Sequence, residues 1–171
     1  RLTPEAVDAS STLAMAELML SGCTLTADHH YVFPKGVEDG IDIQVAAAKR
    51  LGLRVLLTRG SMNLSQRDGG LPPDSVVQDE DTILADSERV VARFHQAGDG
   101  AMIQLALAPC SPFSVTTSLM RATADLALSG VSASRRCISG SNPTVETVMR
   151  RCEKSTPQSV VRVSIAPTVP A

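Results

Sequence analysis

Aromatic residues are almost absent from this chain, which has no tryptophan, one tyrosine and three phenylalanines among 171 residues. Aliphatic side chains and methionine must therefore fill the interior. The sequence also lacks any apolar run near the ~18 residues of a membrane-spanning helix. The first residues do not form the apolar segment of a secretory signal. We therefore expect a cytoplasmic protein that does not span a membrane. Because Arg1 is not a methionine, we also expect the natural start to lie upstream.

Strong charge and paired cysteines are also missing. The formal net charge is −2 and the pI about 5.9, which argues against a nucleic-acid partner. Neither G-x-G-x-x-G nor G-x-x-x-x-G-K-[ST] occurs, so Gly69-Gly70 is not a phosphate loop. No C-x-x-C spacing occurs either. Without an export signal, the four cysteines are expected to be free thiols: Cys23, Cys110, Cys137 and Cys152.

Helical and strand patterns alternate along the first three quarters of the chain. Thr3-Pro4-Glu5 is a helix start, with a capping hydroxyl, a proline at the first position and an acid near the positive end of the dipole. An apolar helix face follows, at Val7, Leu13, Ala14, Leu18 and Met19. Further helices are predicted over residues 41–51, 81–96 and 116–128, with Gly130 after the last. Strands are predicted over residues 23–27, 53–58 and 101–108.

This alternation is typical of parallel βαβ units, whose functional sites lie at the carboxyl ends of the strands. Each predicted strand changes there from apolar to polar or reactive residues. The three strand ends are Asp28-His29-His30, Thr58-Arg59-Gly60 and Ala108-Pro109-Cys110-Ser111. We therefore expect an α/β protein with its site along these ends.

A long polar segment follows the second strand. Roughly 20 residues separate Arg59 from the next helix, and loops of that length are usually functional or disordered. The position between a buried strand and an amphipathic helix favours a loop held over a site. The acidic run Asp79-Glu80-Asp81 most simply begins that helix at its positive end.

The histidines allow several interpretations. His29 and His30 could be structural residues, substrate contacts or metal ligands. Because adjacent strand residues point to opposite faces, at most one of them is expected to face a site. His95 lies near the end of an amphipathic helix and is interpreted as a surface or helix-terminal histidine.

Arg59 and Cys110 are also ambiguous. Arg59 could bind an anionic or carbonyl group through its planar donor fork, or pair with an acid such as Asp28 or Asp68. Cys110 could be a nucleophile only beside a base, and no Cys/His pair is evident from spacing. A pocket wall or a small buried side chain is therefore the simpler interpretation of Cys110.

The composition changes beyond Val131. Residues 132–171 are rich in Ser, Thr, Arg, Pro and Val and contain no histidine. A short helix over 144–154 and a short strand over 159–165 are predicted. We divide the chain into a partial barrel domain, 1–131, and a divergent or frame-shifted tail, 132–171.

Three blocks closely resemble the amidohydrolase superfamily, within it the 8-oxoguanine deaminase and hydroxydechloroatrazine ethylaminohydrolase branch. They read SGCTLTADHHYVFP, TRGSMNLSQRDGGLPPDSVVQDEDTILADS and ALAPCSPFSVT, and the likeness covers residues 1 to about 131. The resemblance implies about three parallel units of a (β/α)8 TIM barrel. It also implies a mononuclear zinc hydrolase whose metal-bound water attacks an amidine-like ring carbon and expels ammonia or an amine.

The resemblance assigns no metal ligand and no catalytic residue to this chain. The family's first His-x-His motif would lie upstream of Arg1, and the strand reading roughly His-Thr-His-Leu-Ala-Glu is missing after Val131. We therefore expect a gene fragment, or a frame change near Val131. The resemblance carries over only the substrate side of the site. Its candidate substrate-binding residues are Arg59, Cys110, His29 and His30.

The expected function is that of a zinc amidohydrolase, or its fragment, which deaminates or dealkylaminates a small purine- or triazine-like substrate. The alternative is a truncated, inactive βα module that binds a partner or has a structural role. Three βα units leave unpaired sheet edges, so we also expect the isolated chain to associate into oligomers or aggregates.

Overall fold

The computed structural model describes residues 2–98 and 100–135. The chain divides into two compact units, Arg1–Gly130 and Val131–Ala171, and the sheet lies in the first. The helix predicted over 144–154 and the strand predicted over 159–165 lie outside the described residues. None of the described helices is both long and apolar enough to cross a membrane.

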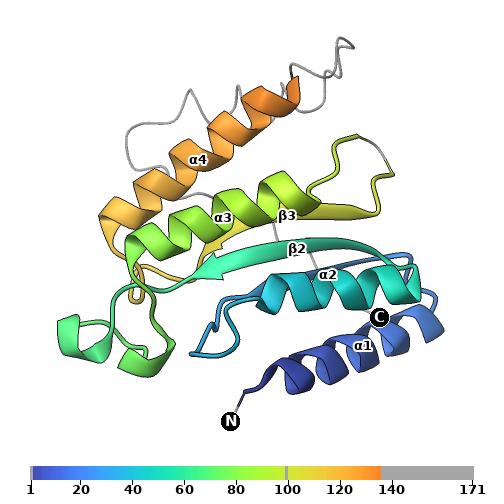
Figure 1. Cartoon of the computed structure of the whole chain (residues 1–171), viewed down its shortest axis with the longest axis horizontal. Helices are drawn as coiled ribbons and strands as arrows, with labels where there is room; N and C mark the ends of the chain where they lie inside the picture. The colour runs from blue at the N-terminus through green and yellow to red at the C-terminus, as the bar shows by residue number, and fades with distance from the viewer. Residues whose placement is uncertain (1, 99, 136–171) are drawn as a thin grey trace, which may run out of the picture. The chain divides into compact units, whose positions relative to one another are not determined.

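The sheet consists of three parallel strands in the order β1-β2-β3 (Figure 1). Their bounds are β1, Leu25–His30; β2, Arg54–Ser61; and β3, Ile103–Pro109. The register places Ala27 beside Leu56 and His30 beside Arg59. On the other side of β2, Val55 lies beside Ile103. The predicted α/β class with three parallel βα units is confirmed, but each strand runs further into its polar end than predicted.

Helix α1, Pro4–Leu20, begins as its sequence predicts. The Thr3 hydroxyl accepts a hydrogen bond of 3.2 Å from the Ala6 amide, and Pro4 occupies the first turn. The predicted apolar face is wrong in part. Leu13 is 62% exposed, whereas Val7 and Met15 are buried. Only the stripe of α1 that packs against the following helix is covered, and this stripe does not include Leu13.

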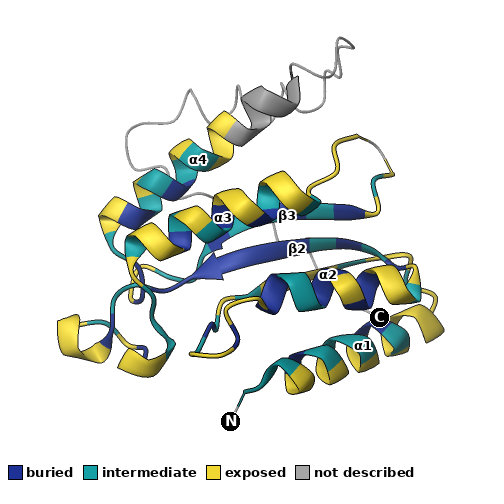
Figure 2. Cartoon of the chain, in the orientation of Figure 1, coloured by how far each residue is buried: buried dark blue, intermediate teal, exposed yellow. Residues whose placement is uncertain are grey.

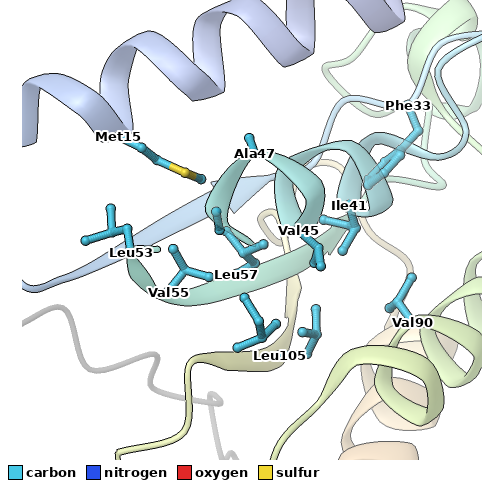
Figure 3. Packing of buried hydrophobic residues seen from close by; sticks show 12 residues of the cluster. Met15, Phe33, Ile41, Val45, Ala47, Leu53, Val55, Leu57, Val90 and Leu105 are labelled. Atoms are coloured by element: carbon cyan, nitrogen blue, oxygen red, sulfur yellow. The ribbon is translucent and has the colours of Figure 1, made fainter. Parts of the chain in front are cut away.

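Helix α2, Gly40–Leu51, and helix α3, Glu80–Phe94, cover one face of the sheet. Figure 2 shows both helices buried on one side and exposed on the other, while β2 is buried along most of its length. The core joins α2 to the strands through Ile41, Val45, Val55, Leu57 and Leu105 (Figure 3). It is almost wholly aliphatic, as the composition predicts. We call this side of the sheet the helix-covered face.

The other side of the sheet carries the alternate strand residues. These are Leu25, Ala27 and His29 of β1, Leu56 and Thr58 of β2, and Gln104 and Ala106 of β3, by the register and the alternation of strand side chains. None of them belongs to the buried apolar clusters found in the described part of the chain. We call this side the open face.

The last described helix, α4, spans Thr117–Arg135 and packs against α3 through Leu119, beside Ile83 and Val115. The prediction that this helix ends before Gly130 is wrong. A glycine inside a helix costs about 1 kcal/mol relative to alanine, which does not by itself end a helix.

Candidate functional site

The polar ends of the three strands meet along one edge of the sheet. The register aligns Gly60 with Ala108 and Ser61 with Pro109. The Cys110 amide then donates a hydrogen bond of 3.0 Å to the Ser61 carbonyl. Parallel strands bring their carboxyl ends together, so residues from three separate stretches of sequence form a common edge.

The loop after β2 is fastened to the turn after β3. Asn63 forms two hydrogen bonds with Thr116: its side-chain amide donates to the Thr116 hydroxyl at 2.9 Å, and its side-chain oxygen accepts from the Thr116 amide at 2.8 Å. The Leu71 amide donates to the Phe113 carbonyl at 3.0 Å. The loop contains two short 3-10 turns, Gln66–Asp68 and Asp74–Val76. It is therefore an ordered segment at the carboxyl edge.

His29 and His30 point to opposite faces, as strand alternation predicts. His29 lies on the open face, where its Nε2 is 3.1 Å from the Ala108 carbonyl oxygen. His30 lies on the helix-covered face, with its ring edge-on to Phe33 at 4.7 Å between centroids. Its Nε2 is buried and has no hydrogen-bond partner among the described residues. Desolvation lowers the pKa of His30 below its ordinary value, and the nearby Arg59 adds to that shift while Asp28 opposes it.

Arg59 also points into the helix-covered face, and its side chain has no exposed surface. Its Nε donates to Asp86 of α3 at 2.9 Å, and the other two nitrogens donate to the Gly60 carbonyl and the Gln78 side chain. The guanidinium carbon lies 4.2 Å from the centre of the Phe33 ring. Burial lowers the pKa of Arg59, and Asp86 opposes that shift. An ion pair is thus present, with Asp86 rather than Asp28 or Asp68 as the acid; contact between Arg59 and a substrate stays a prediction.

Asp86 connects this pair to a more exposed network. Its second oxygen accepts from Arg89 at 2.7 Å, and Arg89 also holds Asp42 of α2. The hydrogen bonds that Arg89 donates to the Asp42 and Asp86 carboxylates raise the pKa of Arg89. Arg93 pairs with Asp42 at 3.0 Å. These ion pairs connect β2 to α3, and α3 to α2, on the helix-covered face.

Asp28 and Cys110 complete the predicted set. Asp28 accepts a hydrogen bond from the side chain of Gln44 in α2, so it serves the packing of β1 on the helix layer. Cys110 follows β3 directly and is a free, half-buried thiol. No histidine is among its hydrogen-bonding partners in the described part of the chain, so the structure adds no base that would activate it.

The residues of the site do not make a metal centre by themselves. Within residues 2–98 and 100–135, no group of three or more His, Cys, Asp or Glu side chains could hold a metal ion. A zinc ion therefore does not fit the described residues as its sole ligands.

Comparison with known families identifies the parent fold. The model of the amidohydrolase family matches residues 1–149. The chain belongs to the amidohydrolase family. A curated relative, the 8-oxoguanine deaminase of Pseudomonas aeruginosa, is 61% identical over 127 residues, covering 74% of this chain and 28% of that protein. The hydroxydechloroatrazine ethylaminohydrolase of Pseudomonas sp. strain ADP is 41% identical over 104 residues, covering 60% of this chain and 22% of that protein.

The three strands of this amidohydrolase chain are part of a TIM barrel. The crystal structure of atrazine chlorohydrolase from Arthrobacter aurescens complexed with zinc superposes with a TM-score of 0.71 at 28% identity. The match covers 75% of this chain and 28% of that structure. The matches thus cover between 22% and 28% of the length of these relatives.

Several residues that shape this site were not predicted from the sequence. Asp86 and Gln78 hold Arg59, and Gly60 lets two chain segments approach closely. A Cβ atom at Gly60 would lie 2.5 Å from Tyr31 Cβ and 2.7 Å from the His30 carbonyl oxygen. In the sequence, the glycine that follows Arg59 within the strand indicates that another backbone segment passes close to it.

Proposed function

We propose that this chain forms the substrate side of an amidohydrolase that releases ammonia or an amine from a purine- or triazine-like ring by hydrolysis. The observation that carries the proposal is the 61% identity to an 8-oxoguanine deaminase over 127 residues of this chain. A hydroxydechloroatrazine ethylaminohydrolase also matches, and its name describes the loss of an amine from a triazine.

The four candidate residues divide between the two faces of the sheet. His29 is on the open face and Cys110 follows β3 at the carboxyl edge, where both are available to a ring. Arg59 and His30 lie behind them and hold the strand ends to the helix layer. In this arrangement His29 and Cys110 contact the ring, and Arg59 and His30 position the strand ends that carry them. The zinc that the family implies would be held by ligands outside the described residues and would supply the activated water.

The test uses a protein in which residues 1–131 are joined to the remainder of an amidohydrolase barrel, which we call the completed barrel. We expect it to bind about one zinc ion per chain, and to release ammonia from 8-oxoguanine or an amine from a hydroxytriazine. Ammonia release is measured by a coupled enzymatic assay, and metal content by mass spectrometry. A folded completed barrel that binds no metal and turns over neither ring would contradict the proposal.

The second candidate is an inactive βα module, favoured by the lack of a metal-binding group among the described residues. It predicts that the 171-residue chain alone hydrolyses neither ring at any zinc concentration. Turnover by the isolated chain would refute it.

The origin of residues 132–171 has a separate test. We propose that a frame change near Val131 produced this tail, because no histidine follows that residue. Reading the nucleotide sequence in the other frames beyond the Val131 codon should reveal a strand resembling His-Thr-His-Leu-Ala-Glu. Absence of such a strand from every frame would contradict the frame change.

A further inference from the structure

A backbone carbonyl determines which nitrogen of His29 carries the proton. His29 Nε2 lies 3.1 Å from the Ala108 carbonyl oxygen, which can only accept a hydrogen bond. Nε2 must therefore be the protonated nitrogen. In the neutral ring, Nδ1 then carries a lone pair and can act only as an acceptor.

The imidazole ring is held in place by contacts on two sides. The Ala108 carbonyl fixes one edge, and Tyr31 packs edge-on at 5.2 Å between ring centroids. Tyr31 can come this close to β2 because Gly60 has no side chain. The ring of His29 is therefore oriented before any ligand arrives.

Nearby strand residues on the open face do not compete for Nδ1. Thr58, the register partner of His29, uses its hydroxyl to donate to the Asp28 carbonyl at 2.6 Å. Ala106 and Ala108 have no polar side-chain atom. None of the described residues shares a hydrogen bond with Nδ1, and His29 is exposed. Nδ1 is thus an oriented acceptor at the carboxyl end of the open face.

We propose that His29 determines substrate specificity by accepting, at Nδ1, a hydrogen bond from an N–H group of the heterocyclic substrate. This inference rests on the proposed function and names one contact within it. The ligand class is a lactam-type heterocycle that presents an N–H at the edge facing His29. A ring with a bare lone pair at that position is disfavoured, because two acceptors would face each other and neither would be satisfied.

Two substitutions of His29 test the roles of its two ring nitrogens separately. In His29→Gln the side-chain amide can still donate to the Ala108 carbonyl, but no acceptor remains at the Nδ1 position. In His29→Asn the shorter side chain keeps an oxygen near Nδ1 and loses the Ala108 contact. We expect kcat/KM of the completed barrel for 8-oxoguanine to fall at least about tenfold in His29→Gln and clearly less in His29→Asn, the loss that one unmade hydrogen bond causes.

His95→Gln serves as the matched control, because it removes an imidazole that contacts the backbone of Leu105 instead of the strand ends. It should leave kcat/KM unchanged. Wild-type activity in His29→Gln, or equal losses in His29→Gln and His29→Asn, would overturn the inference. An inactive wild-type completed barrel would instead contradict the proposed function.

Nitrogen-15 NMR of the imidazole gives a readout that needs no turnover. At a pH where the His29 ring is neutral, zinc-depleted completed barrel should carry the ring proton at Nε2. Addition of 8-oxoguanine should then shift the Nδ1 resonance, while zinc alone should not. An unchanged Nδ1 resonance in the presence of saturating 8-oxoguanine would overturn the inference, and so would a shift caused by zinc alone, which would make Nδ1 a metal ligand.

Discussion

Arg59 places a positive charge in the interior of the helix-covered face, where Asp86, Gln78 and the Gly60 carbonyl surround it. A buried ion pair of this kind is costly to break, because removal of one partner leaves the other charge without compensation. The pair therefore fixes the position of the strand end and of the loop that supplies Gln78.

Substitution of Asp86 tests this role. Asp86→Asn keeps the shape of the side chain and removes the charge that faces Arg59. We expect it to lower the free energy of unfolding of the completed barrel by about 3 kcal/mol, as measured by urea unfolding. Asp74→Asn is the control, because the pair between Arg67 and Asp74 is exposed and its atoms lie 3.9 Å apart. Equal effects of the two substitutions would contradict a structural role for the Arg59 pair.

His30 should make stability depend on pH. Burial lowers the pKa of His30 in the folded protein below the ordinary value of 6.5, so the unfolded chain binds a proton more readily. As pH falls through 6.5 toward the lowered folded pKa, protonation therefore favours the unfolded state. Unfolding free energies measured at about pH 7.5 and about pH 5.5 should show a loss at the lower pH. The loss should be smaller in His30→Leu; an identical pH dependence would contradict this assignment.

Sequence alone predicted that His29 and His30 could not both face the site, because strand alternation is a local property. It could not predict that Arg59 points away from the open face toward Asp86. That outcome depends on which face the helices cover, and the two residues are 27 positions apart. The direction of a polar side chain at a strand end is set by this tertiary packing.

At the level of the strands, Gly60 controls how closely β1 and β2 approach at the carboxyl edge. Its φ angle is not among the positive values in the described residues, so crowding rather than backbone strain is the relevant effect. We expect Gly60→Ala to destabilise the completed barrel by about 1–3 kcal/mol, the usual cost of overpacking.

Thermal unfolding should detect this change, with Ala14→Ser on the exposed side of α1 as the control. The control adds one atom where there is space and should leave the melting temperature nearly unchanged. A Gly60→Ala protein as stable as the control would show that the strands can separate without cost.

The helices and the strands differed in how well their limits could be predicted. Thr3 and Asp79 cap α1 and α3, and Gly52 ends α2 with a φ of 72°, each through a local signal. The strands continue into Asp28, His29 and Arg59 although these residues are polar. Ladder bonds to a neighbouring strand extend them, and no single segment of sequence contains that information.

At the scale of the whole molecule, the two outer edges of the sheet differ in how far other groups cover them. Within the described residues β1 has a strand partner only on its β2 side. The outer edge of β3 is partly covered by the segment after α3: the Gln96 amide donates to the Ile103 carbonyl, and the backbone of Leu105 bonds to the His95 ring. The prediction that His95 is a surface histidine at a helix end is confirmed, because it is exposed and follows α3 directly. Its contact with the edge of β3 was not predicted.

The bare edge of β1 should cause the isolated 171-residue chain to associate, since unpaired strand edges pair with other chains. Light scattering during size-exclusion chromatography should show oligomers whose fraction falls in Leu25→Lys, which adds a charge to this edge strand. Leu13→Lys is the matched control, because Leu13 is equally apolar, exposed and located on α1. A monodisperse wild-type monomer would contradict the prediction.

The covered half of β3 also limits how a fourth strand can join the sheet. An incoming strand meets side-chain and backbone groups of His95 and Gln96 at the start of β3, and free backbone only beyond Leu105. The fourth strand must either form its first backbone hydrogen bonds near Leu107, or displace His95 and Gln96 in order to pair with β3 as far as Ile103. As long as His95 and Gln96 keep these contacts, a fourth strand pairs with β3 from its carboxyl end toward Ile103.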